Sequence, residues 1–92
     1  MSHADELRRL RDHLDATEEL PVRPDASPWL GEAAAIASDL VDAELPPAVV
    51  AERVEHVAAL LDEIETTGNQ SADEHVAAAE RLANRIVTAA DE

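Results

Sequence analysis

The sequence predicts an all-α fold, an up-and-down bundle of about four helices. Apolar residues recur at spacings of three and four along four segments, which is the period of a helix with one buried face. The five prolines all fall between these segments or at their first turns, where proline is tolerated. The chain has 92 residues, enough for one domain with its own core. We therefore treat residues 1–92 as one helical domain.

The first predicted helix covers about residues 3–18. Its apolar seam consists of Leu7, Leu10 and Leu14. The helix is expected to stop before Pro21, because proline disfavours helical backbone in the residue before it. Residues 21–26 contain two prolines and are expected to form an extended, fairly stiff connector.

The second predicted helix covers about residues 28–43, with Ser27 as its N-cap and Pro28 at the first helical position. Its apolar residues form two adjacent stripes, which makes it the central helix. The stripes are Trp29, Ala33, Ile36 and Leu40, and Leu30, Ala37 and Val41. We expect Trp29, the only aromatic residue, to be a packing residue that anchors this helix against the first helix and the connector.

The third and fourth helices are predicted at about 47–67 and 72–90. Gly68 ends the third helix, and Ser71 with Glu74 forms a capping box that starts the fourth. A connection this short predicts an antiparallel hairpin. Alanine supplies 19 of the 42 apolar residues, so the core is thin. A second copy could complete the bundle, and we expect a homodimer.

Charge is the strongest signal in the composition. The chain has 21 acidic residues, seven arginines and no lysine, so the formal net charge is −14. Such a surface repels itself at low ionic strength and is screened in molar salt, which favours a protein adapted to high salt. It also excludes nucleic acid as a direct partner, since that binding depends on Lys and Arg.

No targeting or membrane signal is apparent. The first residues are charged throughout, without the apolar stretch of a signal peptide, and no stretch reaches the ~20 apolar residues needed to span a bilayer. We expect no membrane partner and a cytoplasmic location. The chain has no cysteine and only two glycines, so thiolate chemistry and a glycine-rich phosphate loop are excluded.

Paired acids at i, i+3 are how all-α nucleotide pyrophosphatases hold magnesium, and several pairs fit that spacing. With 21 acids in 92 positions, however, chance alone produces about as many pairs as the chain contains. We therefore interpret them as solvated surface and predict no metal, cofactor or catalytic residue. The weak metal-ligand candidates are Asp39, Glu52, Glu55, His56, Asp62 and Glu65.

Three features are candidates for contact with a partner. Val49 and Leu60 lie beside the main seam of the third helix and could form a second contact surface. His75 projects onto the apolar side of the fourth helix, either as a half-buried residue at an interface edge or as a pH switch of a subunit contact. Arg8, Arg9 and Arg11 form the one basic cluster, either a salt-bridged helix surface or a contact for an acidic face.

The segments PWLGEAAAIASDL and HVAALLDEIETTG, together with the composition, resemble the short acidic conserved proteins of unknown function found in haloarchaea. That resemblance implies an all-helical fold and carries no functional residues. The expected function is a non-enzymatic helical interaction or regulatory protein, with no identifiable small-molecule substrate. One alternative is a divalent-metal-dependent nucleotide phosphohydrolase, and a weaker one is an acidic antitoxin-like partner of a basic protein.

Overall fold

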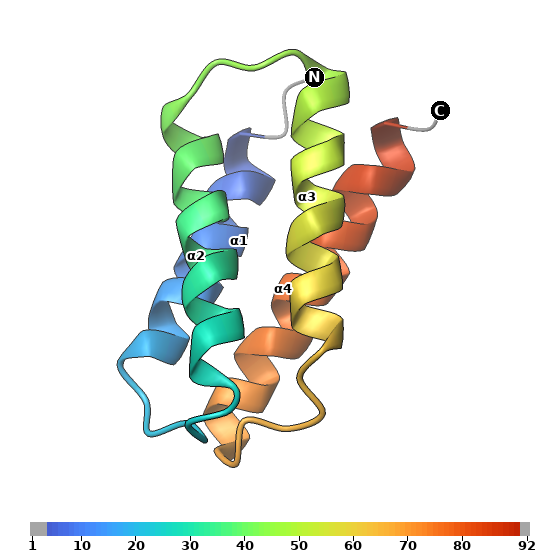
Figure 1. Ribbon diagram of the computed structural model, residues 1–92. Helices are drawn as coiled ribbons and strands as arrows, with labels where there is room; N and C mark the ends of the chain where they lie inside the picture. Colours follow the sequence, from blue (N-terminus) through green and yellow to red (C-terminus); the bar gives the residue numbers. More distant parts are fainter. Residues whose placement is uncertain (1–3, 91–92) are drawn as a thin grey trace.

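A computed structural model of the chain describes residues 4–90 and contains four helices in that range, with no strand (Figure 1). They are α1 (Ala4–Glu18), α2 (Ser27–Asp42), α3 (Pro47–Asp62) and α4 (Gln70–Ala90). Each helix packs against the next, and α4 packs back against α1, so the ring of four is closed within one chain. The predicted all-α bundle and its antiparallel α3–α4 hairpin are confirmed.

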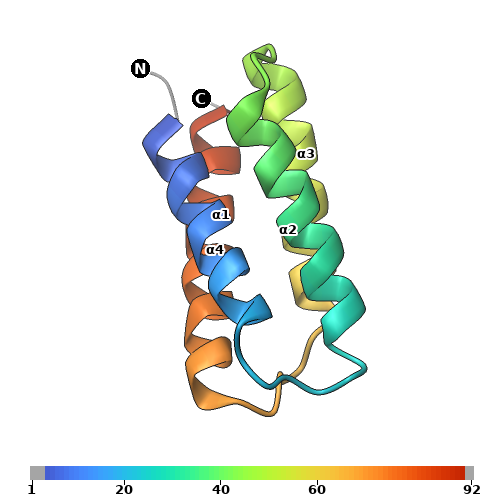
Figure 2. The same cartoon turned by 90° about the vertical axis from the view of Figure 1, so that its left-hand side faces the viewer.

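The two ends of the bundle differ. At the end that we call the open end, α1 begins, α4 ends and residues 43–46 connect α2 to α3 (Figures 1 and 2). At the opposite end, which we call the looped end, residues 19–26 and residues 63–69 cross near one another. The backbone N–H of Arg23 donates to the carbonyl of Thr67 at 2.7 Å, which ties the two loops together.

The core consists of small and medium aliphatic side chains from all four helices. The predicted α1 seam of Leu7, Leu10 and Leu14 is buried, as are the middle positions of the α3 seam. In α2 the buried residues include alanines on adjacent turns, which allow α1 and α3 to approach closely. The buried α2 residues are Leu30, Ala33, Ala34, Ala37 and Leu40. No helix in the described part of the chain is long and apolar enough to cross a membrane.

The start of α2 differs from the prediction. Ser27 is the first helical residue and Ala26 the N-cap, and no side chain caps the helix. The cause is a preceding turn, in which the backbone N–H groups of Ala26 and Ser27 both donate to the carbonyl of Arg23. This turn also shortens the extended connector, because residues 24–26 belong to the turn.

The end of α3 was predicted five residues too late. The helix stops at Asp62. The N–H groups of Glu63 and Ile64 then donate to carbonyls three residues earlier, at 3.2 and 3.1 Å, which tightens the last turn. Two features accompany this earlier end. The carboxylates of Asp62 and Glu63 oppose the dipole at a helix C-terminus, and the backbone of Thr67 bonds to other partners instead of continuing the helix.

The start of α4 is also corrected. The expected capping box of Ser71 and Glu74 does not form, because α4 begins one residue before that serine. Asn69 takes the capping role, since its Oδ1 accepts from the N–H of Ala72 at 3.0 Å. At the other end of the chain, the predicted start of α1 at residue 3 lies outside the described residues.

Trp29 is not a core residue. It is 37% exposed, the one large apolar side chain among the described residues with such exposure. It lines a hollow of about 230 Å³ at the looped end, beside the connector and the loop after α3, with Ala26 and Ile64 among its neighbours. Trp29 thus shares this hollow with residues of the connector and of the loop after α3, and no residue of α1 lines it. Leu30, one position on, takes the buried place in α2.

Candidate interaction site

An apolar hollow of about 600 Å³ lies at the open end of the bundle. All four helices and the α2–α3 connection contribute to it. Its principal aliphatic lining residues are Leu7, Leu40, Val41, Leu45, Val50 and Ile86. A concave apolar surface of this size is typical of a binding site on a small protein.

The sequence explains why the hollow stays open. Ala43 has extended backbone, and Pro46 is extended as the N-cap of α3, so residues 43–46 span between the helix ends without folding over them. The side chains of Val41, Leu45 and Val50 are half-buried, packed against the core on one side only. The alanines that line the rest of the hollow are too short to fill it.

Two opposite charges also line this hollow. Arg8 comes from α1 and Glu44 from the α2–α3 connection. The Arg8 guanidinium lies 3.5 Å from the carboxylate of Asp5, and both side chains are well exposed. An exposed pair of this kind contributes little to stability, so Arg8 can exchange Asp5 for another carboxylate at small cost.

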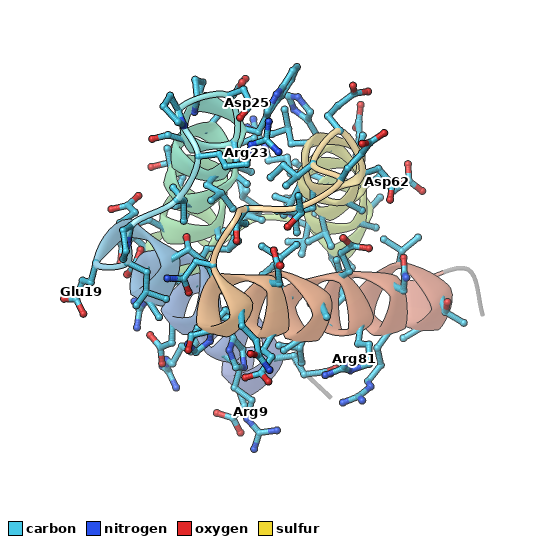
Figure 3. The ribbon with its side chains drawn as sticks, turned by 90° about the horizontal axis from the view of Figure 1, so that it is seen from below. Arg9, Glu19, Arg23, Asp25, Asp62 and Arg81 are labelled. Carbon is cyan, nitrogen blue, oxygen red and sulfur yellow. The ribbon has the colours of Figure 1, made fainter. Side chains whose placement is uncertain are left out.

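The arginines are concentrated on one side of the molecule. Five of the seven belong to α1 and α4, whereas residues 21–69 contain ten carboxylates and only two arginines. Figure 3 shows Arg9 and Arg81 projecting from the side formed by α1 and α4, away from α2 and α3. The predicted cluster of Arg8, Arg9 and Arg11 lies on α1, and its ion pairs are to Asp5 and Asp12.

The two contact residues proposed beside the α3 seam separate. Leu60 is buried in the core and is not available to a partner. Val49 is half-buried near the first turn of α3 and does not line the hollow at the open end. The expected contact surface containing both residues is therefore wrong, because Leu60 faces inward.

The metal-ligand candidates do not converge. All six side chains are exposed: Asp39, Glu52, Glu55, His56, Asp62 and Glu65. Within residues 4–90, no group of three or more His, Asp or Glu side chains is placed to hold a metal ion. A magnesium site needs several oxygen ligands around one point, and these acids lie on solvated helix surfaces.

His75 lies on the seam between α4 and α1, where it meets His13. Their Nδ1 atoms are 2.9 Å apart, and the ring centroids are 5.2 Å apart with the planes tilted by 47°. Both residues are half-buried. Burial, the neighbouring His75 ring and the Arg81 guanidinium lower the pKa of His13, while the Asp12 carboxylate acts in the opposite direction.

Sequence reasoning identified His75 and missed His13. Both follow the same rule, because each sits one position from a buried residue on its helix, Leu14 and Val76. The signal that could have found the pair is that His13 and His75 lie near the looped ends of two antiparallel neighbours, α1 and α4. The lining of the hollow was missed for another reason, since it is formed by helix ends that meet only in the folded chain.

These features define an acidic four-helix bundle with an apolar hollow at one end. The chain belongs to the DUF8152 family, described as a domain of unknown function, whose model matches residues 6–92. Searches of curated proteins and of solved structures found no match.

Proposed function

We propose that this chain is a non-enzymatic interaction protein that acts as a homodimer, with two copies meeting through the hollow at the open end. The observation that supports this most is the lining of that hollow, in which half-buried Val41, Leu45 and Val50 keep part of their apolar surface in water. Covering this surface gives association its driving force. Because the ring of helices is closed in one chain, the second copy serves to cover the end rather than to complete the bundle.

The charges at the hollow favour a second copy over an unrelated partner. In a two-fold dimer every contact occurs twice, so a copy docked with its Arg8 against Glu44 of the other also places its own Glu44 against the other's Arg8. A single surface that carries both signs is self-complementary. This arrangement places attraction where the copies meet, in a molecule whose net charge of −14 otherwise drives copies apart.

Two neighbouring valines provide a matched test. Val50 lines the hollow and Val49 does not, although both are half-buried near the start of α3. We expect light scattering in molar KCl to give a dimer mass for the native chain and for Val49→Arg, and a monomer mass for Val50→Arg. A native chain that is monomeric at all salt concentrations overturns the homodimer. Equal disruption by both variants contradicts the hollow as the interface.

Charge reversal tests the orientation of the two copies. Arg8→Glu should weaken the dimer, because it places two carboxylates opposite each other, and adding Glu44→Arg should restore it. Failure of the double variant to recover the dimer would contradict the two-fold pairing while leaving the apolar contact to be judged by the valine pair. Both variants should retain native helicity by circular dichroism, since both residues are exposed.

We further infer that the protein works in a cytoplasm of high salt, as the haloarchaeal resemblance implies. The support is the composition, with 21 acids, seven arginines and no lysine. At molar salt the Debye length falls to about 3 Å, so repulsion among these carboxylates is screened. Helicity and melting temperature should therefore rise steeply between low and molar KCl. A melting temperature that does not depend on salt would contradict this part of the proposal.

A second candidate is an acidic partner of a basic protein, and the uneven charge favours it. The α2 and α3 side carries most of the uncompensated carboxylates, with Arg23 and Arg53 as the arginines between residues 21 and 69. Co-purification from the native host at molar salt would recover a basic protein if this candidate holds. No observation favours the metal-dependent phosphohydrolase, because its acids lie apart on exposed surface.

A further inference from the structure

We propose that His13 and His75 form a two-imidazole site for a divalent transition-metal ion that prefers right-angled coordination, the class of Cu²⁺ and Ni²⁺. The proposal is independent of the homodimer, because the pair lies on the α1–α4 seam and away from the hollow at the open end. It rests on the separation of the two nitrogens and on the helices that hold them.

The separation of the two Nδ1 atoms matches two ligands on one metal ion. Imidazole nitrogens bind such ions at about 2.0–2.1 Å, so two of them at a right angle are about 2.9 Å apart, whereas tetrahedral zinc needs about 3.4 Å. The His13 and His75 Nδ1 atoms are 2.9 Å apart. Square-planar and tetragonal nitrogen sites are typical of Cu²⁺ and Ni²⁺. Because the rings turn when the ion binds, this distance shows that one ion can reach both nitrogens, and the affinity order of divalent first-row ions for nitrogen ligands favours Cu²⁺ over Zn²⁺.

The pair is held by two rigid elements. His13 follows the α1 core position Leu10 by three residues and precedes buried Leu14, and His75 lies between buried Ala72 and Val76 on α4. The two backbones are thus fixed by the core of the bundle, and binding requires the rings to rotate but not the helices to move. Ligands on packed helices keep their geometry better than ligands on loops.

The protonation states are compatible with binding. Without metal, one Nδ1 carries a proton and donates to the lone pair of the other. For binding, that ring takes the tautomer with its proton on Nε2, which frees both Nδ1 lone pairs without any net loss of a proton. The Asp12 carboxylate favours positive charge at His13 and Arg81 opposes it. Water oxygens would occupy the remaining coordination positions.

The chain offers a matched control for the test. It has four histidines, and His56 is an exposed single histidine on α3. All proteins carry His3→Ala, so that only the pair and His56 remain. In this background we compare the parent protein with the variants His13→Gln, His75→Gln and His56→Gln. Glutamine is used because it keeps a polar side chain at the half-buried positions. Circular dichroism checks that each variant is folded.

The probes are CuCl₂, NiCl₂ and ZnCl₂. The binding of each metal ion is measured by calorimetric titration and by thermal unfolding in KCl. We expect one Cu²⁺ or Ni²⁺ per chain, weaker binding of Zn²⁺, and a rise in melting temperature of roughly 10–20 °C at a hundredfold excess over Kd. The electron paramagnetic resonance spectrum of the Cu²⁺ form should show coupling to two imidazole nitrogens. His13→Gln and His75→Gln should each lose the tight site, and His56→Gln should keep it.

Three results would overturn the proposal. One is binding that survives both His13→Gln and His75→Gln, which would place the metal elsewhere. Another is loss of binding in His56→Gln. The third is the absence of any metal-dependent shift in the parent protein, which would leave the pair as a hydrogen bond between helices.

Discussion

A single carboxylate oxygen of Asp73 lies 2.7 Å from both the backbone nitrogen and the side-chain hydroxyl of Thr67. The other oxygen of Asp73 accepts from the hydroxyl of Thr66 at 3.0 Å. Because Thr67 is fully buried and its carbonyl also accepts from Arg23, this contact joins the start of α4 to both loops of the looped end. These polar contacts therefore add to the apolar packing of Ala26, Val22 and Ile64 at that end.

Thr67→Val should destabilise the protein by about 1–3 kcal/mol, because the change keeps the shape of the side chain and removes a buried hydroxyl. That hydroxyl lies 2.7 Å from Asp73 Oδ1 and 2.9 Å from the carbonyl of Asn69, and it also accepts from the N–H of Asn69. Urea unfolding in molar KCl measures the change. Thr66→Val is the control, since Thr66 is exposed, and it should cost clearly less. Equal costs for the two variants would contradict the role assigned to Thr67.

Stability should fall in acid partly through Asp73. The backbone N–H of Thr67, followed by its hydroxyl, lowers the pKa of Asp73 below its ordinary value of 3.8. A carboxyl group with a lowered pKa in the folded state takes up its proton first in the unfolded state. Its contribution to stability is therefore complete above the ordinary pKa and is lost as the pH falls through the folded pKa. The Asp73→Asn variant should be less stable than the native chain at pH 7, and its stability should depend less on pH in the acid range below the ordinary pKa. Thermal unfolding as a function of pH measures both effects.

The two glycines should respond to alanine in opposite directions. Gly68 has φ of +79°, and a Cβ there would lie 2.7 Å from Cγ of Arg23. The Arg23 side chain is exposed and can move, so the main cost of Gly68→Ala is the left-handed backbone, about 1–2 kcal/mol. Gly31 lies inside α2 with open space around it, and Gly31→Ala should stabilise by about 1 kcal/mol. Chemical unfolding of both variants checks the contrast, and a stabilising Gly68→Ala would refute it.

How much of this structure could be predicted depends on the range of the interactions. The first helix was predictable from the spacing of Leu7, Leu10 and Leu14, because residues on one face of a helix lie three or four positions apart in the sequence. The capping box of Ser71 and Glu74 failed because Asn69, an equally good cap two positions earlier, is fixed by Thr67. Residues that meet only across the fold leave no local pattern.

The candidate sites follow the same logic. His75 was recognisable as a histidine on an apolar face, but its partner His13 is 62 residues away in the chain. The exposure of Trp29 could not be read from its stripe, because Ala33 and Leu40 of the same stripe are buried while Trp29, in the first turn of α2, is 37% exposed. The excess of acids, in contrast, was readable at once because net charge does not depend on the fold.

Glu80 is one residue at which the excess of acids lowers the stability of the fold. Burial, and then the charge of Asp62 on the neighbouring α3, raise the pKa of Glu80 above its ordinary value of 4.5. A raised carboxyl pKa means that the charged form costs stability at neutral pH, and that this cost disappears as the pH falls through the folded pKa. Glu80→Gln removes the charge and nearly keeps the shape. Because Glu80 is partly exposed, solvent screens the repulsion, and the gain at low salt should be at most about 1 kcal/mol.

Salt should reduce that gain, because molar KCl screens the repulsion between Asp62 and Glu80 without removing the cost of burial. Thermal unfolding of the native chain and of Glu80→Gln, each at 0.1 M and at molar KCl, measures the effect. Glu74→Gln is a matched control, since Glu74 is exposed on the same helix and its variant changes the net charge equally. If Glu74→Gln stabilises the protein as much as Glu80→Gln does, the gain comes from net charge alone. A larger gain for Glu80→Gln assigns the difference to the α3–α4 contact.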